Sequence, residues 1–450
     1  MLPLMLAGYL FLLIFRPYEY WTILGDFHVE RVYMLAFIAV ALLQKDKRLL
    51  PNSINGAVVC FALTLLLSAT FGINWSNSWP FVVDYLKYVV FYFMVILSVR
   101  DEKDFRLALL AFLGVMCLYV GKSAWEFFIH DKHVFRMGIK RMIGIDSTYG
   151  DPNSFAASIC YSLPLAWALI RSKFRSTWVT RFLWAYGLLA LTAVMFTGSR
   201  SGMVTFILFL LLIIMGSSRK IWGILLVGVV LVVSWDYMPE KLQMRFLSTF
   251  SEEYAEKGAQ ASAEGRTQGF LRGLELFKSN PTLGIGPDNF RFSWPGMASG
   301  PNVHNIYGQV LSELGTAGLL SFGLLLLLLY RQNRSIVTRY QRLAPQKPDE
   351  DGGKLPASVR KGALRDGRAG NGRNDPSPLP QKGIPSALAV QSITRFHSLV
   401  GQAIIQTMIL MLFKGWADHN LYRYTWLWLA ALTVLGTHFF SQELQRHGQA

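Results

Sequence analysis

Long apolar runs separated by polar connections dominate the pattern along this chain of 450 residues. A helix needs about 20 apolar residues to cross the roughly 30 Å hydrocarbon core of a bilayer. The pattern therefore predicts about twelve membrane-spanning helices, near residues 2–15, 29–43, 54–71, 81–98, 105–129, 153–170, 179–197, 201–215, 219–237, 303–330, 396–415 and 421–440. Three of these runs are short, which leaves the exact number open. The composition, 52% hydrophobic and 16% charged, also indicates an all-α polytopic integral membrane protein.

The basic residues of the connections predict how the helices are oriented, because inner loops are enriched in Lys and Arg. With the N-terminus inside, each of five inner loops carries at least two such residues, whereas the outer loop 72–80 carries none. This assignment places the hydrophilic segments 130–152 and 238–302 outside the cell membrane. Loop 130–152 is nevertheless basic, which indicates an anionic ligand on the outer side.

The pattern divides the chain into five parts. Residues 1–237 contain nine membrane helices, and 238–302 form one large outer loop with an amphipathic helix that acts as a lid. Residues 303–330 form the tenth helix, 331–395 a basic inner insertion, and 396–450 the last two helices and an inner tail. The insertion carries 13 basic and 5 acidic residues with few large apolar side chains, which is typical of disorder. We expect it to lie against anionic lipid and not nucleic acid.

Arg200 lies in the short connection TGSRSG between two apolar runs. Ser199 or Ser201 is suited to cap the helix that follows, so that Arg200 comes at its N-terminus. Free backbone N–H groups and the helix dipole already favour an anion there. The connection therefore predicts an anion site on the outer side. The alternative is an arginine that reaches to lipid phosphates.

The large outer loop supplies a second arginine. In GRTQGFLRGLELFKSNP, the side chains of Phe270, Leu274 and Phe277 share one face, which predicts a helix lying along the membrane interface. Arg266 is near the start of this helix and is a second candidate for binding the anion. The following GIGPDNF, which contains Asp288, reads as a tight turn back to the membrane, because no strand precedes it.

His304 opens the next apolar run. Behind it, Asn305, Gln309, Ser312 and Glu313 fall on one polar stripe if the run is helical from its start. A carboxylate two turns into a span should face protein or water and not lipid. His304 is a candidate general base, since its unperturbed pKa is about 6.5.

Further polar residues face the same side. Asp418, His419 and Arg423 form a cluster that competes with His304 as the site. The stretch HDKHVFRMGIKRMIGIDSTYGDPNSF supplies supporting candidates, namely Arg136, Arg141, Asp151 and Asn153. No Asp-x-Asp pair stands in an outer loop, and no histidine cluster has metal-ligand spacing. We therefore expect chemistry without a metal ion or another cofactor.

Arginines, one histidine and one buried carboxylate suit displacement of a pyrophosphate leaving group by an alcohol. The planar guanidinium binds pyrophosphate oxygens in pairs, and a histidine can deprotonate the hydroxyl. An anion transporter could use the same residues, with Arg200 and Glu313 lining its pathway. A scaffold without catalysis is a third possibility, and it predicts that no outward polar residue is individually essential.

TGSRSG, the loop stretch GRTQGFLRGLELFKSNPTLGIGPDNF, HNIYGQVLSELGTAGLL and DSTYGDPNSFA together resemble the O-antigen ligase and polymerase superfamily, over roughly residues 140–330. The resemblance implies a bacterial inner-membrane glycosyltransferase of the GT-C type. Such an enzyme moves a glycan from undecaprenyl pyrophosphate to lipopolysaccharide core or another envelope acceptor, at the periplasmic face and without a metal. A polymerase would instead use a second lipid-linked glycan as acceptor.

The resemblance also implies residue roles. Arg200 and Arg266 would contact the pyrophosphate, and His304 would activate the acceptor hydroxyl, with inversion at the anomeric carbon. Apart from the resemblance, we expect Asn305, Glu313 and Asp288 to support the site or bind the acceptor. The insertion 342–395 departs from the compact inner link of the family, and the modest outer loop leaves the type of acceptor open.

Overall fold

The computed structural model describes residues 1–44, 49–136, 138–146, 150–172, 176–217, 220–236, 240–247, 257–343 and 387–446. The first half of the chain contains α1 (Leu2–Ile14), α2 (Thr22–Asp26), α3 (Val29–Leu43), α4 (Ser53–Phe71), α5 (Trp75–Ser98), α6 (Glu102–Phe128), α7 (Pro152–Arg171), α8 (Thr177–Phe196) and α9 (Arg200–Met215). The second half contains α10 (Lys220–Asp236), α11 (Glu240–Leu247), α12 (Lys257–Ser279), α13 (Ile306–Gln309), a π-helical turn (Val310–Leu314), α14 (Gly315–Leu343), α16 (Ala387–Gly415) and α17 (Tyr424–Arg446). One antiparallel hairpin, β1 (Val134–Arg136) with β2 (Ile139–Arg141), precedes α7.

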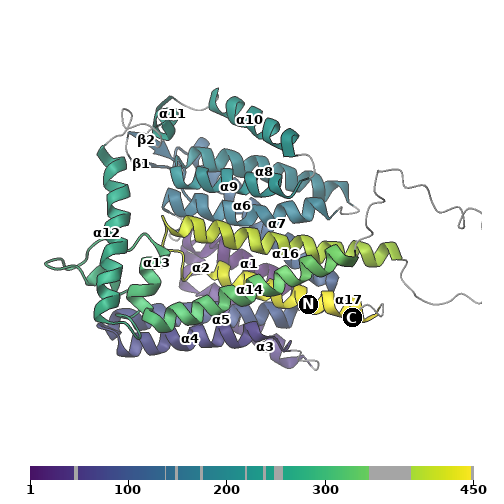
Figure 1. The fold of residues 1–450 in the computed structure, drawn as a ribbon, viewed down its shortest axis with the longest axis horizontal. Coiled ribbons are helices and arrows are strands. Elements are labelled where there is room, and N and C mark those ends of the chain that lie inside the picture. Colours follow the sequence, from purple (N-terminus) through teal and green to yellow (C-terminus); the bar gives the residue numbers. More distant parts are fainter. Residues whose placement is uncertain are drawn as a thin grey trace, which may run out of the picture.

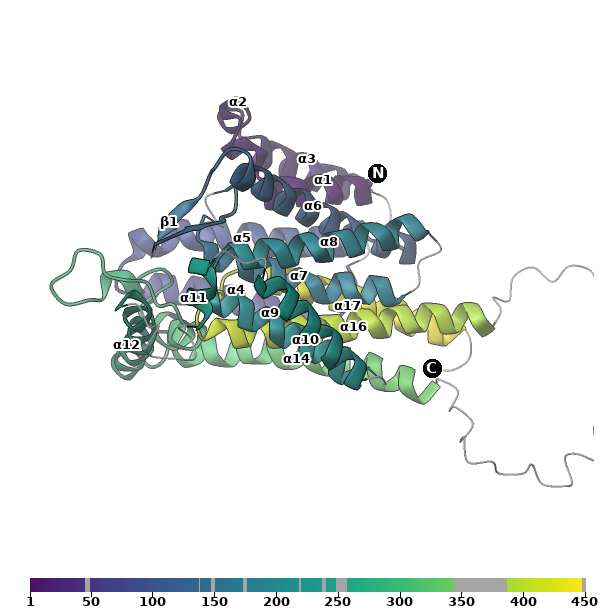
Figure 2. The same cartoon turned by 90° about the horizontal axis from the view of Figure 1, so that it is seen from above.

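The long helices run side by side as a bundle (Figure 1). Helix α12 lies across one end of this bundle, nearly perpendicular to the other helices, and the hairpin lies at the same end (Figures 1 and 2). Helix α12 packs against α13 and the π-helical turn. The loops that come together at the α12 end therefore derive from distant parts of the sequence.

Eight of the described helices are long and apolar enough to cross a membrane, and α9 and the first part of α10 are shorter apolar helices. The prediction of an all-α polytopic membrane protein is confirmed. The predicted runs 29–43 and 421–440 correspond to α3 and α17, but neither is among these candidate spans. The count of about twelve and the orientation of the helices stay predictions.

Helix α17 lies inside the bundle, where it packs against α5, α14 and α16. Its residues from Tyr424 to Gly436 are all buried, and Trp426 and Trp428 are among the largest fully buried side chains. These side chains contact protein and not lipid, and van der Waals packing of the aromatic rings holds α17 in place. Helix α17 therefore lies in the core of the bundle, although its composition does not place it among the candidate membrane spans.

Several helix starts are fixed by local capping. The side chains of Asn52, Asp101, Asp151 and Ser199 each accept a hydrogen bond from a backbone N–H in the first turn of α4, α6, α7 and α9. These bonds satisfy amides that the helix itself leaves without partners. The predicted cap at Ser199 is confirmed, and it places Arg200 as the first residue of α9.

Some predicted boundaries need correction. Helix α14 continues to Leu343 and α16 begins at Ala387, so the insertion predicted for 331–395 overlaps helices at both of its ends. Apolar side chains at Ile336 and Val337 are buried, which carries α14 beyond its hydrophobic run. Residues 344–386, the rest of that prediction, lie outside the described residues.

The turn at residues 284–290 holds α14 at its start. Gly284 and Gly286 have positive φ values of 70° and 97°, which confirms the predicted tight turn. The backbone N–H groups of Ile285 and Gly286 donate to the carbonyls of Ser312 and Glu313, at 2.8 and 3.0 Å. Residues 284–290 thereby supply hydrogen bonds to carbonyls that the π-helical segment 310–314 exposes.

Replacing Gly284 by alanine should destabilise the protein strongly. A Cβ there would lie 2.4 Å from the Glu313 carbonyl carbon, in addition to the strain of a positive φ. We expect a loss of about 1–3 kcal/mol from the clash beyond about 1–2 kcal/mol from the backbone strain. Gly296→Ala is the matched control, because its φ is 71° and no atom lies within 4 Å of the added Cβ. Equal shifts of the unfolding midpoint in detergent for both variants would contradict this account.

Candidate active site

Two histidines meet at the α12 end of the bundle. Asn305 caps α13, with its side-chain oxygen accepting from the N–H groups of Tyr307 and Gly308, and this places His304 in the segment just before the helix. The ring of His304 lies 5.3 Å from the ring of His419, centroid to centroid, at an interplanar angle of 58°. The cluster around His419 and the His304 segment are therefore one group of residues, not two competing sites.

A buried ion pair supports this group. Lys414 and Asp418 are only 1% and 3% exposed, and the Lys414 Nζ lies 3.8 Å from the Asp418 Oδ2. The backbone N–H of His419 donates to Asp418 Oδ1 at 3.0 Å. Burial alone would raise the pKa of Asp418, but the charges of Lys414, Arg423 and His419 outweigh it and hold that pKa below its usual value. Asp418 is therefore ionised, and it fixes the backbone that carries His419.

Replacing Lys414 by methionine should unfold or strongly destabilise the protein. The variant leaves the Asp418 carboxylate buried without its countercharge, which typically costs about 3–5 kcal/mol. The double variant Lys414→Met with Asp418→Asn removes both charges and should recover much of this loss. Thermal unfolding of the purified variants in detergent measures the effect. A single variant as stable as the wild type would show that the pair does not stabilise the fold.

The segment around Arg200 is held in place by buried polar contacts. The Arg141 guanidinium donates to the Thr197 carbonyl at 2.7 Å and to the Asn153 Oδ1 at 3.1 Å. The hydroxyl of Ser199 also donates to that Asn153 oxygen, at 2.9 Å. Arg141 is only 2% exposed, so its charge is used to shape this turn. Arg141 and Asn153 thus hold the turn that directly precedes Arg200.

Arg200 and Arg266 act on each other electrostatically although they come from different helices, α9 and α12. Burial, and then the neighbouring charge of Arg200, lowers the pKa of Arg266 from its usual value, whereas Asp418 raises it. Asp151, at the N-terminus of α7, is within electrostatic range of both His304 and His419. Arginines, histidines and carboxylates from α7, α9, α12 and the 416–423 segment therefore converge on one region.

Both histidines are weaker bases than free imidazole. His304 is exposed at its surface, yet the protein atoms packed around it lower its pKa; Asp418 and Asp151 oppose this shift, and Arg266 and Lys414 add to it. Burial lowers the pKa of His419 to about 4, although part of its ring remains accessible. Both rings are consequently neutral at pH 7, with one nitrogen available to accept a proton.

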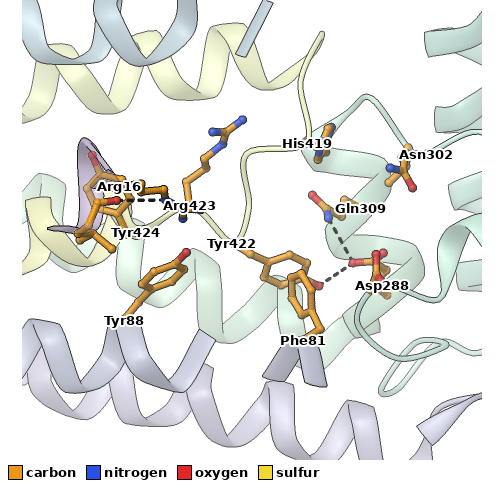
Figure 3. Close-up of a pocket in the computed structure, with 13 residues that line it drawn as sticks. Arg16, Phe81, Tyr88, Asp288, Asn302, Gln309, His419, Tyr422, Arg423 and Tyr424 are labelled. Carbon is orange, nitrogen blue, oxygen red and sulfur yellow. Dashed lines mark hydrogen bonds between the residues drawn. The ribbon is translucent and has the colours of Figure 1, made fainter. Parts of the chain in front are cut away.

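A cavity of about 270 Å³ opens beside His419. Figure 3 shows side chains from several helices and loops around it. The residues that line it are Leu13, Arg16, Phe81, Tyr88, Asp288, Asn302, Val303, Gln309, Glu313, His419, Tyr422, Arg423 and Tyr424. The cavity thus connects His419 with the carboxylates of Asp288 and of Glu313 in the π-helical turn.

Glu313 is 2% exposed, as predicted for a carboxylate that avoids lipid. Its Oε2 accepts from the Tyr422 hydroxyl at 2.7 Å and from the Gln309 amide at 3.3 Å. The sequence predicted a polar stripe on one regular helix. The predicted regular helix is wrong, because the segment is not α-helical throughout. Asn305 is a cap outside α13, and the π-helical turn at 310–314 changes the helical phase.

Two predicted residues lie apart from the histidine pair. Arg136 is exposed on β1, and among the described residues no hydrogen bond or ion pair joins it to this group. Asp288, with a positive φ of 59°, pairs with Arg291 at 2.8 Å and lines the far part of the cavity. Burial raises the pKa of Asp288, although Arg291 opposes the shift.

Sequence reasoning missed Lys414 and Tyr422. The signal for Lys414 was present, because a lysine at the end of an apolar run, four residues before an aspartate, is a costly charge that requires a partner. Tyr422 had no comparable signal. Within the described part of the chain, no group of three or more His, Cys, Asp or Glu side chains is placed to hold a metal ion.

Residues 185–323 match the family described as O-antigen ligase. This stretch of the chain is similar to an O-antigen ligase domain. It includes Arg200, Arg266, His304 and Glu313, whereas the histidine partner His419 lies beyond it. The resemblance expected from the sequence motifs is confirmed, and the domain supports a membrane glycosyltransferase of the ligase or polymerase type. No curated protein matches the chain.

Proposed function

We propose that this protein transfers a glycan from undecaprenyl pyrophosphate to a hydroxyl of lipopolysaccharide core or another envelope acceptor, at the periplasmic face of the bacterial inner membrane. The observation that carries the proposal is the convergence of Arg200, Arg266, His304 and His419 at one end of the bundle. We place this end, with α12 as a lid, in the periplasm, because the basic inner loops lie at the other ends of the helices.

In this mechanism Arg200 and Arg266 bind the pyrophosphate and stabilise the negative charge that develops as it leaves. His304 accepts the proton of the acceptor hydroxyl, whose oxygen forms the new bond to the anomeric carbon. The bond from that carbon to the pyrophosphate oxygen breaks on the opposite face, so the anomeric configuration is inverted. The proposed reaction is of the GT-C type and uses no metal ion.

Asp418 and Asp151 support this role of His304. Their negative charges favour the imidazolium that forms when His304 takes the proton. Burial and Arg266 oppose it, so His304 remains neutral before the reaction. The two arginines are close enough to act on one ligand, since each affects the other electrostatically. These charges support the proposal of His304 as the base and of the two arginines as the leaving-group site.

The rate of transfer should rise with pH as His304 loses its proton. Because the pKa of His304 lies below the ordinary 6.5, the acid limb of the rate profile should have its midpoint below this value. A His419→Gln variant should keep the midpoint, since the pKa of His419 is already about 4. Rates of wild-type protein between pH 4 and 8 measure the limb. A midpoint above 6.5 would contradict the assignment of His304 as base.

A polymerase would keep these residues and take a second lipid-linked glycan as acceptor. Cells that lack the protein distinguish the two, because loss of transfer to the final acceptor indicates a ligase and single repeat units on that acceptor indicate a polymerase. An anion transporter would need Arg200 and Glu313 on one pathway. In the described part of the chain, the cavity wall includes Glu313 but not Arg200, and this favours the transferase.

A further inference from the structure

The cavity beside His419 has an aromatic wall. Phe81 and Tyr422 meet edge to face with ring centroids 4.7 Å apart, and Tyr88 and Tyr424 lie 6.2 Å apart. All four residues line the cavity (Figure 3). Aromatic rings present apolar surface at low conformational cost. This wall suits a ligand that has an apolar face of C–H groups.

A polar wall faces the same space. Gln309 is only 6% exposed, and among the described residues no donor reaches its Oε1. Its amide nitrogen is already used on Glu313, so the oxygen is held as an acceptor. A buried acceptor without a donor is costly unless a ligand supplies one. Glu313 and Asp288 add carboxylate oxygens beside it. The wall therefore suits a ligand that carries a hydroxyl group able to donate to this oxygen.

The size of the cavity fits such a ligand. Its volume is about 270 Å³, and one monosaccharide ring with its hydroxyls can be placed within this space. A sugar ring also has the apolar face and the polar rim that the two walls demand.

We propose that this cavity binds one neutral pyranose ring, with a hydroxyl donating to Gln309 Oε1 and an apolar ring face against Phe81 and Tyr422. His419 lines the cavity, and its ring lies 5.3 Å from the ring of His304, centroid to centroid. Arg266 in turn acts electrostatically on His304. If the proposed function holds, on which this last step rests, the ring is the terminal sugar of the acceptor. Its reactive hydroxyl then points to the histidine pair.

Methyl pyranosides are suitable probes, because they need no lipid and no reaction. Saturation-transfer NMR of purified protein in nanodiscs, with methyl glucoside, galactoside, mannoside and N-acetylglucosaminide, measures their binding, and mannitol serves as an acyclic reference. We expect at least one pyranoside to bind and mannitol not to bind. Gln309→Met and Phe81→Leu should each weaken binding about fivefold, as loss of one neutral contact does. Gln406→Met, the same change in a different cavity, should have no effect.

The proposal is overturned if no pyranoside gives more signal than mannitol, or if Gln309→Met binds as the wild type does. These results are independent of catalysis. Pyranoside binding in a protein whose His304→Ala variant still transfers glycan would overturn the proposed function and leave the sugar site. Loss of transfer in that variant, without pyranoside binding by the wild type, would overturn the sugar site alone.

Discussion

Replacing His304 by alanine is expected to slow glycan transfer by roughly 10²- to 10⁴-fold, the usual contribution of a general base. The reason is that, among the residues that the structure describes, the other histidine of the pair is the weaker base. His419 has a pKa of about 4, so it is a much weaker acceptor of protons. Because the His304 side chain is exposed, its loss should change the unfolding midpoint little. Transfer by membranes that contain equal amounts of each variant gives the measurement.

Two further variants make this result specific. His130→Ala removes an exposed histidine that is not part of the pair, and it should transfer glycan at the wild-type rate. His419→Ala should reduce transfer less than His304→Ala does. In our account His419 positions the His304 ring, whereas His304 itself accepts the proton. A larger loss in His419→Ala than in His304→Ala would assign the base to His419 instead.

Arg200→Ala and Arg266→Ala should each lower transfer by roughly 10²- to 10³-fold, as expected when one group that stabilises developing charge is removed. Lysine at either position should recover only part of the activity, because an ammonium group cannot bind two phosphate oxygens with a planar fork. The double variant should lose less than the product of the single losses, since both arginines act on one ligand.

Lys278→Ala is the matched control on helix α12. Lys278 is an exposed cation on the same helix as Arg266, and we expect its replacement to leave transfer unchanged. Near wild-type transfer by Arg200→Ala would instead support an arginine that only contacts lipid phosphates. Equal losses in Lys278→Ala and Arg266→Ala would indicate a general effect of charge on this helix.

The helices could be predicted from the sequence because their signals are local. Apolar runs and caps such as Ser199 depend on neighbours within one turn, and the structure has the expected helix starting at Arg200. The tight turn at Gly284 was also predictable, since glycine tolerates the positive φ that it needs. Long-range contact is not needed to specify any of these features.

The assembly of the site could not be predicted, because its parts are distant in the sequence. His304 and His419 are brought together by the packing of α13 against α16, and no periodicity records that contact. The π-helical turn at 310–314 likewise depends on the turn at 284–290, whose amides bind its carbonyls. Gln309 was assigned to a polar stripe, but its role in a cavity depends on aromatic residues from α5 and the 416–424 segment.

The most direct test is reconstitution of the purified protein into proteoliposomes that contain an undecaprenyl-pyrophosphate-linked glycan and a lipopolysaccharide-core acceptor, with a chelator present. Our account predicts that the wild-type protein forms glycosylated acceptor and releases undecaprenyl pyrophosphate in equal amounts. It also predicts that His304→Ala forms both products at least about 10²-fold more slowly. Uptake of an anionic solute by the same vesicles, without any glycosylated acceptor, would contradict the account.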